Sequence, residues 1–345
     1  MRGPKRSAQR RASSGESRSR ARMICSGAMG MGGIIGGGNG FSSLRAGLGM
    51  GGLKAMRLKS PAKVNLTLKI LGKRADGFHE LETLMCPVGI YDGIVLEAAE
   101  DGGIHLEIEG ADLPADESNL AWKAAALVQE AAGEARGVRI RLEKRIPMGG
   151  GLAGGSGNAA LVLAGVNRLW GAGLGLNELK GLAGRMGSDI AFFLDGGPSL
   201  CTGRGEITRP VELEMDAEVL LLNPGFGVPT PWAYRAYAAA PGQGAEGQRE
   251  WTLKCEGRAE GFRLRNDLEP AVFGKYLWIA EAKAWLGGQP EVAEAMMSGS
   301  GATVFALVEP GRVEELVARA RAHFGPNCWI QRAPLLTCPQ PLLPE

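Results

Sequence analysis

The sequence predicts a mixed α/β protein of the α+β type, with helices and strands divided between two domains. Residues 64–70 and 104–108 alternate apolar and polar side chains with the period of two that is typical of half-buried strands. Residues 119–135 instead place apolar side chains at helical spacings. The chain has 345 residues, a length at which two domains are expected.

Composition excludes several classes of protein. Hydrophobic residues make up 45% and charged residues 22%, and no apolar run reaches the roughly 18 residues that a membrane span needs. The six cysteines are scattered without close pairs, which favours reduced thiols, a cytoplasmic location and no structural metal site. Outside residues 1–56 acidic side chains outnumber basic ones, which argues against a nucleic-acid-binding surface.

Residues 1–56 form a separate basic and glycine-rich leader. They hold ten basic side chains and the single acid Glu16, and they lack periodic apolar residues, so we expect disorder. An Arg- and Ser-rich start also fits an organelle transit peptide. A third interpretation is that Met56 is the true start, because a strand-like pattern follows it directly.

The elements expected in the first half begin with the strand at 64–70. Residues 91–100 form another strand after a turn at the Asp92-Gly93 pair, and 104–108 form the next. The helix at 119–135 is capped by Ser118 or Asn119, and a strand follows at 138–142.

The next elements follow the glycine-rich residues 149–157. Ser156 or Asn158 is expected to cap a helix through residues 161–169, and a shorter helix covers 177–186. Ser188 is placed to cap the segment that begins after Gly187. Further along, the sequence predicts the elements of the last third: a hairpin at 200–211, strands at 218–225 and 301–308, and a helix at 311–324.

The stretch "PMGGGLAGGSGNAA" places six glycines between 149 and 157, directly before a helical pattern. A dinucleotide-binding loop needs an acidic residue about 20 positions later, where Leu169 stands. A P-loop needs Lys and Ser or Thr where Ser156 and Gly157 stand. The remaining phosphate site is a kinase loop whose amides and following helix surround a triphosphate. A tight strand-to-helix turn without a ligand is the alternative.

Four segments in this order resemble motifs of the GHMP small-molecule kinases. They are "PAKVNLTLKILGKRADGFHEL" (61–81), "PMGGGLAGGSGNAA" (147–160), "GSDIAFFL" (187–194) and "SGSGATVFAL" (298–307), within a resemblance that covers about residues 56–335. The resemblance implies a two-domain GHMP kinase fold with mixed sheets. An ATP-binding domain would cover 57–200 and a ferredoxin-like domain 201–335, with the active site in the cleft between them.

The first segment narrows the implied substrate. "PAKVNLTL" joined to "RADGFHEL" resembles the members that act on an alcohol carrying a cytidine diphosphate group. The resemblance implies ATP with Mg²⁺ as the phosphoryl donor, and a monomer or weak homodimer. Two alternatives stay open: a GHMP kinase for another small alcohol, such as mevalonate or a sugar, and a non-catalytic ATP-binding regulator.

The resemblance also implies roles for individual residues. Asp189 would take the proton from the substrate hydroxyl, with Lys63 between that hydroxyl and the phosphates. An N-cap or a surface ion pair is the alternative for Asp189. The implied ATP-binding residues are Asn119, Lys144, Pro147, Met148, Gly149, Gly150, Gly151, Leu152, Ala153, Gly154, Gly155, Ser156 and Gly157. For Asn119 and Lys144, a helix cap and a surface charge are the respective alternatives.

The substrate end is implied by the same motifs. Phe78 and Tyr234 would stack on the cytosine ring, His79 would bind it by hydrogen bonds, and Asn65 would reach the diol or a phosphate. A purely structural role is the alternative for His79. The "SGSG" motif at 298–301 would close over the substrate and support the first loop, and a simple β-turn is the alternative. One departure stands out: the family loop commonly reads G-S-S-N, and here Gly157 replaces the second serine.

Overall fold

A computed structural model of the chain describes residues 54–133, 136–240, 242 and 244–343. All of them belong to one compact unit, Leu48–Glu345. The predicted leader lies outside the described residues up to position 53, and the first strand begins at Ala55. None of the helices in the described ranges is long and apolar enough to cross a membrane.

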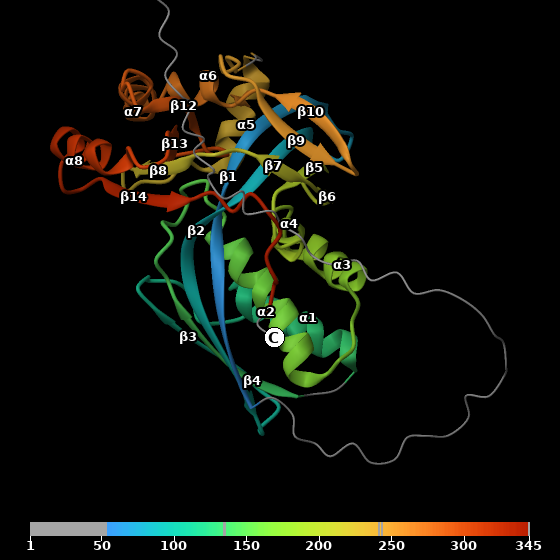
Figure 1. Cartoon of the computed structure of the whole chain (residues 1–345). Helices are drawn as coiled ribbons and strands as arrows, with labels where there is room; N and C mark the ends of the chain where they lie inside the picture. Colours follow the sequence, from blue (N-terminus) through green and yellow to red (C-terminus); the bar gives the residue numbers. More distant parts are fainter. Residues whose placement is uncertain (1–53, 134–135, 241, 243, 344–345) are drawn as a thin grey trace, which may run out of the picture. The chain divides into compact units, whose positions relative to one another are not determined.

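The first half is built on a mixed sheet around two long antiparallel strands, β1 (Ala55–Lys73) and β2 (His79–Ala99). The sheet order is β11-β1-β2-β4-β3, and a β5–β6 hairpin continues from β2 (Figure 1). The other strands are β3 (Ile104–Glu109), β4 (Gly137–Glu143), β5 (Ser199–Gly203), β6 (Ile207–Pro210) and β11 (Arg265–Asn266). The strands expected at 64–70, 104–108 and 138–142 and the expected hairpin are thus confirmed.

The turn expected at Asp92-Gly93 is wrong, because β2 runs straight through this pair. Asp92 lies opposite Ser60 of β1 and is fully buried. Its carboxylate accepts hydrogen bonds from the backbone amides of Arg145 and Ile146. These tertiary partners satisfy the carboxylate inside the sheet, so the local turn preference of Asp-Gly is overridden.

Four helices cover one face of this sheet: α1 (Leu120–Ala132), α2 (Gly154–Trp170), α3 (Leu176–Met186) and α4 (Ile190–Leu194) (Figure 1). Asn119, one of the two residues expected to cap this helix, caps α1. Ser156 and Asn158 do not cap α2, because the helix begins at Gly154 and Ala153 holds the N-cap position. Ser188 does not cap α4 either, because Asp189 holds that position.

The second half contains a four-stranded antiparallel sheet in the order β12-β13-β8-β14. Its strands are β8 (Glu218–Asn223), β12 (Val292–Met297), β13 (Val304–Val308) and β14 (Trp329–Pro334). Helices α7 (Leu277–Gly287) and α8 (Val313–Phe324) pack on one face. The chain order β8, α7, β12, β13, α8, β14 with this sheet order is the ferredoxin-like arrangement that the resemblance implied.

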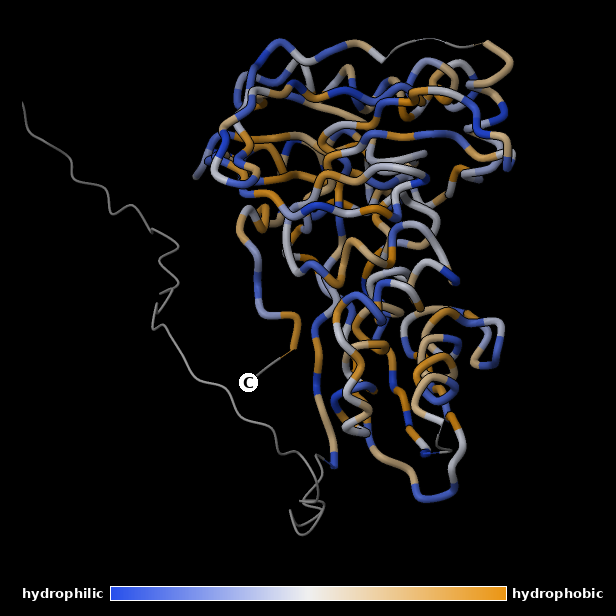
Figure 2. The backbone as a smooth tube through the Cα atoms, turned by 90° about the vertical axis from the view of Figure 1, so that its right-hand side faces the viewer, coloured by the Kyte–Doolittle hydropathy of each residue, from blue (hydrophilic) through white to orange (hydrophobic). Residues whose placement is uncertain are grey.

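Smaller elements complete this half. Helices α5 (Thr230–Ala239) and α6 (Glu269–Phe273) precede α7. Strands β7 (Glu212–Glu214), β9 (Trp251–Cys255) and β10 (Arg258–Phe262) form a separate sheet in the order β10-β9-β7. Hydrophobic and hydrophilic stretches alternate along the strands and helices, and hydrophilic residues are frequent at the outer turns (Figure 2).

The two halves share a core. Val64 and Leu66 of β1 pack in one cluster with Leu221, Phe305 and Leu307 of the second sheet. Strand β5 crosses the expected domain boundary at residue 200, and β11 returns to pair with β1. The division at 200 therefore stays a prediction, although the two-domain architecture itself is present.

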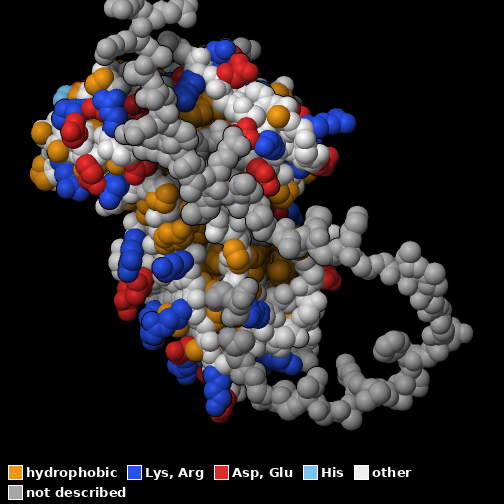
Figure 3. Space-filling view, viewed as in Figure 1, with side chains coloured by type: hydrophobic (Ala, Val, Ile, Leu, Met, Phe, Trp, Pro, Cys, Tyr) orange, Lys and Arg blue, Asp and Glu red, His pale blue; other side chains and the backbone are white. Residues whose placement is uncertain are grey.

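Charge on the outer surface is mixed on the face shown in Figure 3. Basic and acidic side chains are interspersed over α8 and along the β3–β4 edge. Arg141 of β4 pairs with Glu107 of β3, and Arg332 of β14 pairs with Glu314 of α8. Neither sign dominates this face.

Candidate active site

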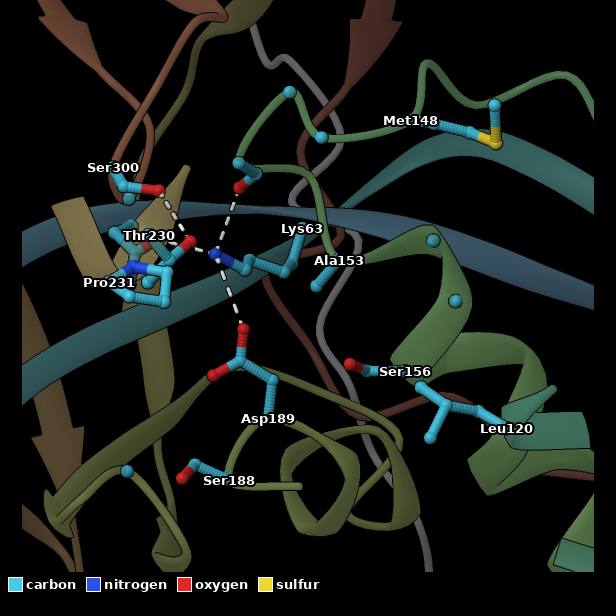
Figure 4. Close-up of a pocket in the computed structure, with 18 of the residues that line it drawn as sticks. Lys63, Leu120, Met148, Ala153, Ser156, Ser188, Asp189, Thr230, Pro231 and Ser300 are labelled. Atoms are coloured by element: carbon cyan, nitrogen blue, oxygen red, sulfur yellow. Dashed lines mark hydrogen bonds and ion pairs between the residues drawn. The ribbon is translucent and has the colours of Figure 1, made fainter. Parts of the chain in front are cut away.

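A cavity of about 900 Å³ opens between the two halves. Lys63, the glycine loop and Asp189 line it from the first half, and Thr230 and Ser300 line it from the second (Figure 4). Tyr234 of the second half lines it as well. The volume lies within the roughly 300–1,000 Å³ that is usual for small-molecule sites. The cleft expected from the resemblance is therefore present.

Lys63 lies at the centre of this cavity with only 3% of its surface exposed. Its Nζ donates to Asn65 Oδ1 at 2.6 Å and to the Gly151 carbonyl at 2.9 Å, and it pairs with Asp189 Oδ2 at 3.7 Å (Figure 4). Burial lowers the pKa of Lys63 below its usual value, and the negative charge of Asp189 opposes this shift. Three protein oxygens therefore surround the Lys63 ammonium.

Asp189 stands at the N-cap position of α4, but its side chain caps nothing. The carboxylate is 38% exposed and lines the cavity. The ion pair with Lys63 is not a surface pair, because Lys63 is buried. The geometry therefore leaves an acceptor that faces the cavity beside a fixed cation.

The glycine loop is shaped by contacts with the second half. Gly151 has a φ of 77°, and a Cβ there would lie 2.1 Å from the Ser298 carbonyl oxygen. Ser298 Oγ donates to the Gly151 carbonyl, and the Thr303 amide donates to the Gly150 carbonyl. Only glycine fits so close an approach with positive φ. The expectation that the "SGSG" segment supports this loop is confirmed.

Most of the implied ATP-binding residues line the cavity. They are Asn119, Lys144, Pro147, Met148, Gly149, Gly150, Gly151, Ala153, Gly154, Gly155 and Ser156. Leu152 and Gly157 do not line it. Leu152 is buried beneath the loop, where its carbonyl accepts from the Lys63 amide, and Gly157 faces β1.

The alternatives considered for Asn119 and Lys144 have different outcomes. Asn119 is a helix cap: its Oδ1 accepts from the Ala121 amide and its Nδ2 donates to the Pro114 carbonyl. Lys144 is not a surface charge. Its side chain is buried, pairs with Asp92 and donates to Asn158 Oδ1.

Aromatic side chains line a further part of the cavity. The rings of His79 and Tyr234 stack with centroids 5.3 Å apart and an interplanar angle of 25°. Phe78 is 53% exposed, with the Arg204 guanidinium 5.0 Å from its ring centroid. Burial, and to a lesser extent Lys73, lowers the pKa of His79 below its usual value, which favours the neutral imidazole. The three residues expected at the cytosine site therefore lie together.

Asn65 is engaged on both sides of its amide, since its Oδ1 accepts from Lys63 and its Nδ2 donates to Thr83 Oγ1. This arrangement orients Lys63, and contact with substrate stays a prediction. Ser300, within the 298–301 motif expected near the active site, lines the cavity. Sequence reasoning missed Arg204 and Thr230, which line it as well. Of these, only Arg204 had a signal, as a basic residue between two glycines at a hairpin tip.

Known protein families and individual relatives match most of this chain. Residues 119–197 match the GHMP kinases N terminal domain and residues 252–326 the GHMP kinases C terminal domain. The 4-diphosphocytidyl-2-C-methyl-D-erythritol kinase of Methylacidiphilum infernorum is 43% identical over 277 residues, or 79% of this chain and 94% of that one. The enzyme of the same name from a Synechococcus species is 40% identical over 78% of this chain and 89% of that one.

The chain belongs to the GHMP kinase family, in its 4-diphosphocytidyl-2-C-methyl-D-erythritol kinase branch. A crystal structure of a 4-(cytidine 5'-diphospho)-2C-methyl-D-erythritol kinase is 32% identical, with a TM-score of 0.61 over 81% of this chain and 99% of that one. Homoserine kinase from Cytophaga hutchinsonii, at 17% identity and a TM-score of 0.60 over 85% of this chain and 98% of that one, shares the GHMP kinase fold. The chain is therefore a small-molecule kinase.

The structure gives a steric reason for Gly157, the departure from the common family loop. A Cβ at this position would lie 2.6 Å from Ser60 Oγ and 3.1 Å from the Pro61 carbonyl oxygen. Ser60 is fully buried, and its hydroxyl has no hydrogen-bond partner among the described residues. Ser60 thus occupies, from β1, the space that a side chain at 157 would need.

This steric relation predicts a coupled pair of substitutions. Gly157→Ala should lower the free energy of unfolding by about 1–3 kcal/mol, the usual effect of overpacking a core. Ser60→Ala should be nearly neutral because the hydroxyl it removes has no partner. The double variant should lose less than Gly157→Ala alone, as measured by urea unfolding. Strictly additive changes would contradict the proposed contact.

Proposed function

We propose that the protein transfers the γ-phosphoryl group of ATP to the 2-hydroxyl of 4-diphosphocytidyl-2-C-methyl-D-erythritol, giving the 2-phosphate. This reaction belongs to the non-mevalonate route of isoprenoid biosynthesis. The observation that carries the proposal is the placement of Lys63 and Asp189 in one cavity with the glycine loop and with the stacked His79 and Tyr234. The relatives from Methylacidiphilum infernorum and Synechococcus are named as kinases of this alcohol, which supports the same reaction.

ATP would bind with its phosphates against the glycine loop and the start of α2. The first amides of a helix lack intrahelical partners, and Gly154, Gly155 and Ser156 all line the cavity there. The helix dipole contributes about 0.3–1 kcal/mol for an anion, and hydrogen bonds to charged oxygens about 1.5–3 kcal/mol each. Backbone groups can therefore hold the triphosphate.

Phosphoryl transfer then needs position and positive charge more than covalent chemistry. Asp189 orients the substrate hydroxyl, whose oxygen forms the new bond to the γ-phosphorus as the bond to the bridging β,γ-oxygen breaks. The hydroxyl proton passes to the Asp189 carboxylate, and ADP leaves. The Lys63 ammonium, fixed by Asn65 and the Gly151 carbonyl, stabilises the charge on the transferring group.

Magnesium fits the donors present. The Ser156 hydroxyl and the Asp189 carboxylate both line the cavity, and hard oxygen donors are those that Mg²⁺ prefers. The described residues contain no group of three or more His, Cys, Asp and Glu that could hold a metal ion, so the ion would be held largely by ATP itself. When bound, Mg²⁺ would neutralise charge on the β- and γ-phosphates.

The cytosine ring would lie at the aromatic end, between Phe78 and Tyr234, with the His79 imidazole at its edge. All three residues line the cavity, and stacking on an aromatic face is worth about 1–3 kcal/mol per base.

We infer further that the protein works in the cytoplasm as a monomer or weak homodimer. The cysteines in the described part of the chain form no disulfide, which supports a reducing location.

A substrate comparison tests the proposed function. The purified protein should phosphorylate the cytidylyl alcohol at least 1,000-fold more efficiently, in kcat/KM, than mevalonate or galactose. Tyr234→Ala should raise the KM for the cytidylyl alcohol about tenfold, the equivalent of losing one stacking contact. The KM for ATP serves as the control and should stay within twofold. Comparable turnover of mevalonate or galactose would reject the proposed substrate.

A second prediction concerns the acceptor for the hydroxyl proton. Asp189→Asn keeps the shape of the side chain but removes its basicity, so turnover should fall at least 1,000-fold. ATP binding, measured by calorimetry, should stay within a few-fold because backbone amides of the glycine loop and of the start of α2 hold most of the triphosphate. Turnover that survives the substitution would refute the role.

A third prediction follows from the lowered pKa of His79. The imidazole is neutral at pH 7 and gains a proton only below its ordinary value near 6.5. Protonation adds a cation near Lys73, so the KM for the cytidylyl alcohol should rise as the pH falls from 7 to 5. In His79→Gln, which cannot titrate, that rise should disappear. A rise of equal size in the variant would assign the pH dependence to another group.

A further inference from the structure

One buried carboxylate contacts both ends of the glycine loop. Asp92 of β2 accepts from the amides of Arg145 at 2.7 Å and Ile146 at 3.0 Å, just before the loop. On the far side of the loop, Asn158 of α2 donates its Nδ2 to Asp92 Oδ2 at 3.1 Å. Asp92 thus joins residues on either side of the segment 147–153.

The charge of this carboxylate is balanced by Lys144. The Lys144 ammonium pairs with Asp92 Oδ2 and donates to Asn158 Oδ1 at 2.8 Å, so the three side chains form a closed ring of contacts. Both charged groups are buried, and a buried charge is costly unless it is paired and hydrogen-bonded. Lys144 also lines the cavity.

The two ends of the loop are also in steric contact. A Cβ on Gly154, the first residue of α2, would lie 3.0 Å from Ile146 Cγ2 and 3.3 Å from Asp92 Oδ2. Ile146, before the loop, and Gly154, after it, therefore lie against each other beside the Asp92 carboxylate. Their separation is set by this contact and by the hydrogen bonds to Asp92.

We propose that Asp92 is a positioning residue for ATP, which holds the glycine loop in its phosphate-binding shape before the nucleotide arrives. Asp92 does not line the cavity itself and acts through Lys144, Asn158 and the amides of residues 145 and 146. A loop fixed in advance loses less conformational freedom on binding, so nucleotide affinity rises. The inference rests on the proposed function only in taking ATP as the ligand of this loop.

Asp92→Asn tests the proposal against a matched control. An Asn side chain turns an amide group toward donors, so the network loses acceptors while the volume is unchanged. Asp267 is the control, because it is equally buried, accepts from the amides of Ile70 and Gly244, and pairs with Arg265, none of which belongs to the network around Asp92. Both variants should lower the melting temperature, which reports the loss of a buried charge network.

The two variants should differ in nucleotide binding. For Asp92→Asn, the Kd for ATP by calorimetry should rise at least tenfold, and hydrogen exchange of the amides in 148–156 should accelerate. For Asp267→Asn, both should stay within twofold of the wild type. An ATP Kd that is unchanged in Asp92→Asn, or raised equally in both variants, would overturn the positioning role.

Asn158→Ala decides the question if Asp92→Asn fails to fold. It removes the two contacts that the Asn158 side chain makes, with Asp92 and with Lys144, and leaves the Asp92–Lys144 pair intact. The Kd for ATP should rise at least threefold with a small change in melting temperature, and an unchanged Kd would reject the proposal. None of these measurements uses the cytidylyl alcohol, so they stand even if another alcohol proves to be the substrate.

Discussion

The site depends on one constraint, which is that the Lys63 ammonium is buried and must be surrounded by oxygens. An unpaired charge in a protein interior is strongly unfavourable. The three oxygens come from separate places in the chain: Asn65 on the same strand, Gly151 in the loop and Asp189 before α4. Satisfying one cation therefore brings strand, loop and helix together, and this convergence forms the centre of the cavity. Asn65 is fixed in turn by Thr83 of β2, so the position of Lys63 is set by the central strand pair.

The second half of the chain acts on the same point from the other side. Ser298 and Lys63 both donate to the Gly151 carbonyl, so one backbone oxygen links the glycine loop to both halves. Asn266 donates to the Met297 and Gly299 carbonyls and thereby holds the segment that carries Ser298. The second half therefore shapes the glycine loop and also supplies Tyr234 to the cavity. The glycine loop and the segment 298–301 are far apart in sequence and meet at this carbonyl oxygen.

Much of the fold was predictable because its signals are local. The period-two strands, the helix capped by Asn119 and the glycine loop were found from residue patterns alone, and the motif resemblance located Lys63, Asp189, His79 and Tyr234. The failures concern residues whose partners are distant in sequence. The turn at Asp92-Gly93, the cap offered by Asn158 and the surface-charge alternative for Lys144 are wrong. Asp92, Lys144 and Asn158 instead satisfy one another inside the core, a contact that no local pattern records.

The unequal burial of Lys63 and Asp189 also determines which group can respond to ligands. Lys63 is held by three oxygens and nearly excluded from water, whereas the Asp189 carboxylate is 38% exposed and faces the cavity. Burial lowers the pKa of Lys63, and Asp189 is the main group that opposes this shift. A molecule in the cavity therefore meets the exposed Asp189 carboxylate more readily than the buried ammonium, which keeps its contacts with Asn65 and Gly151. The group that balances the charge of Lys63 is thus also the group of this pair that faces the cavity.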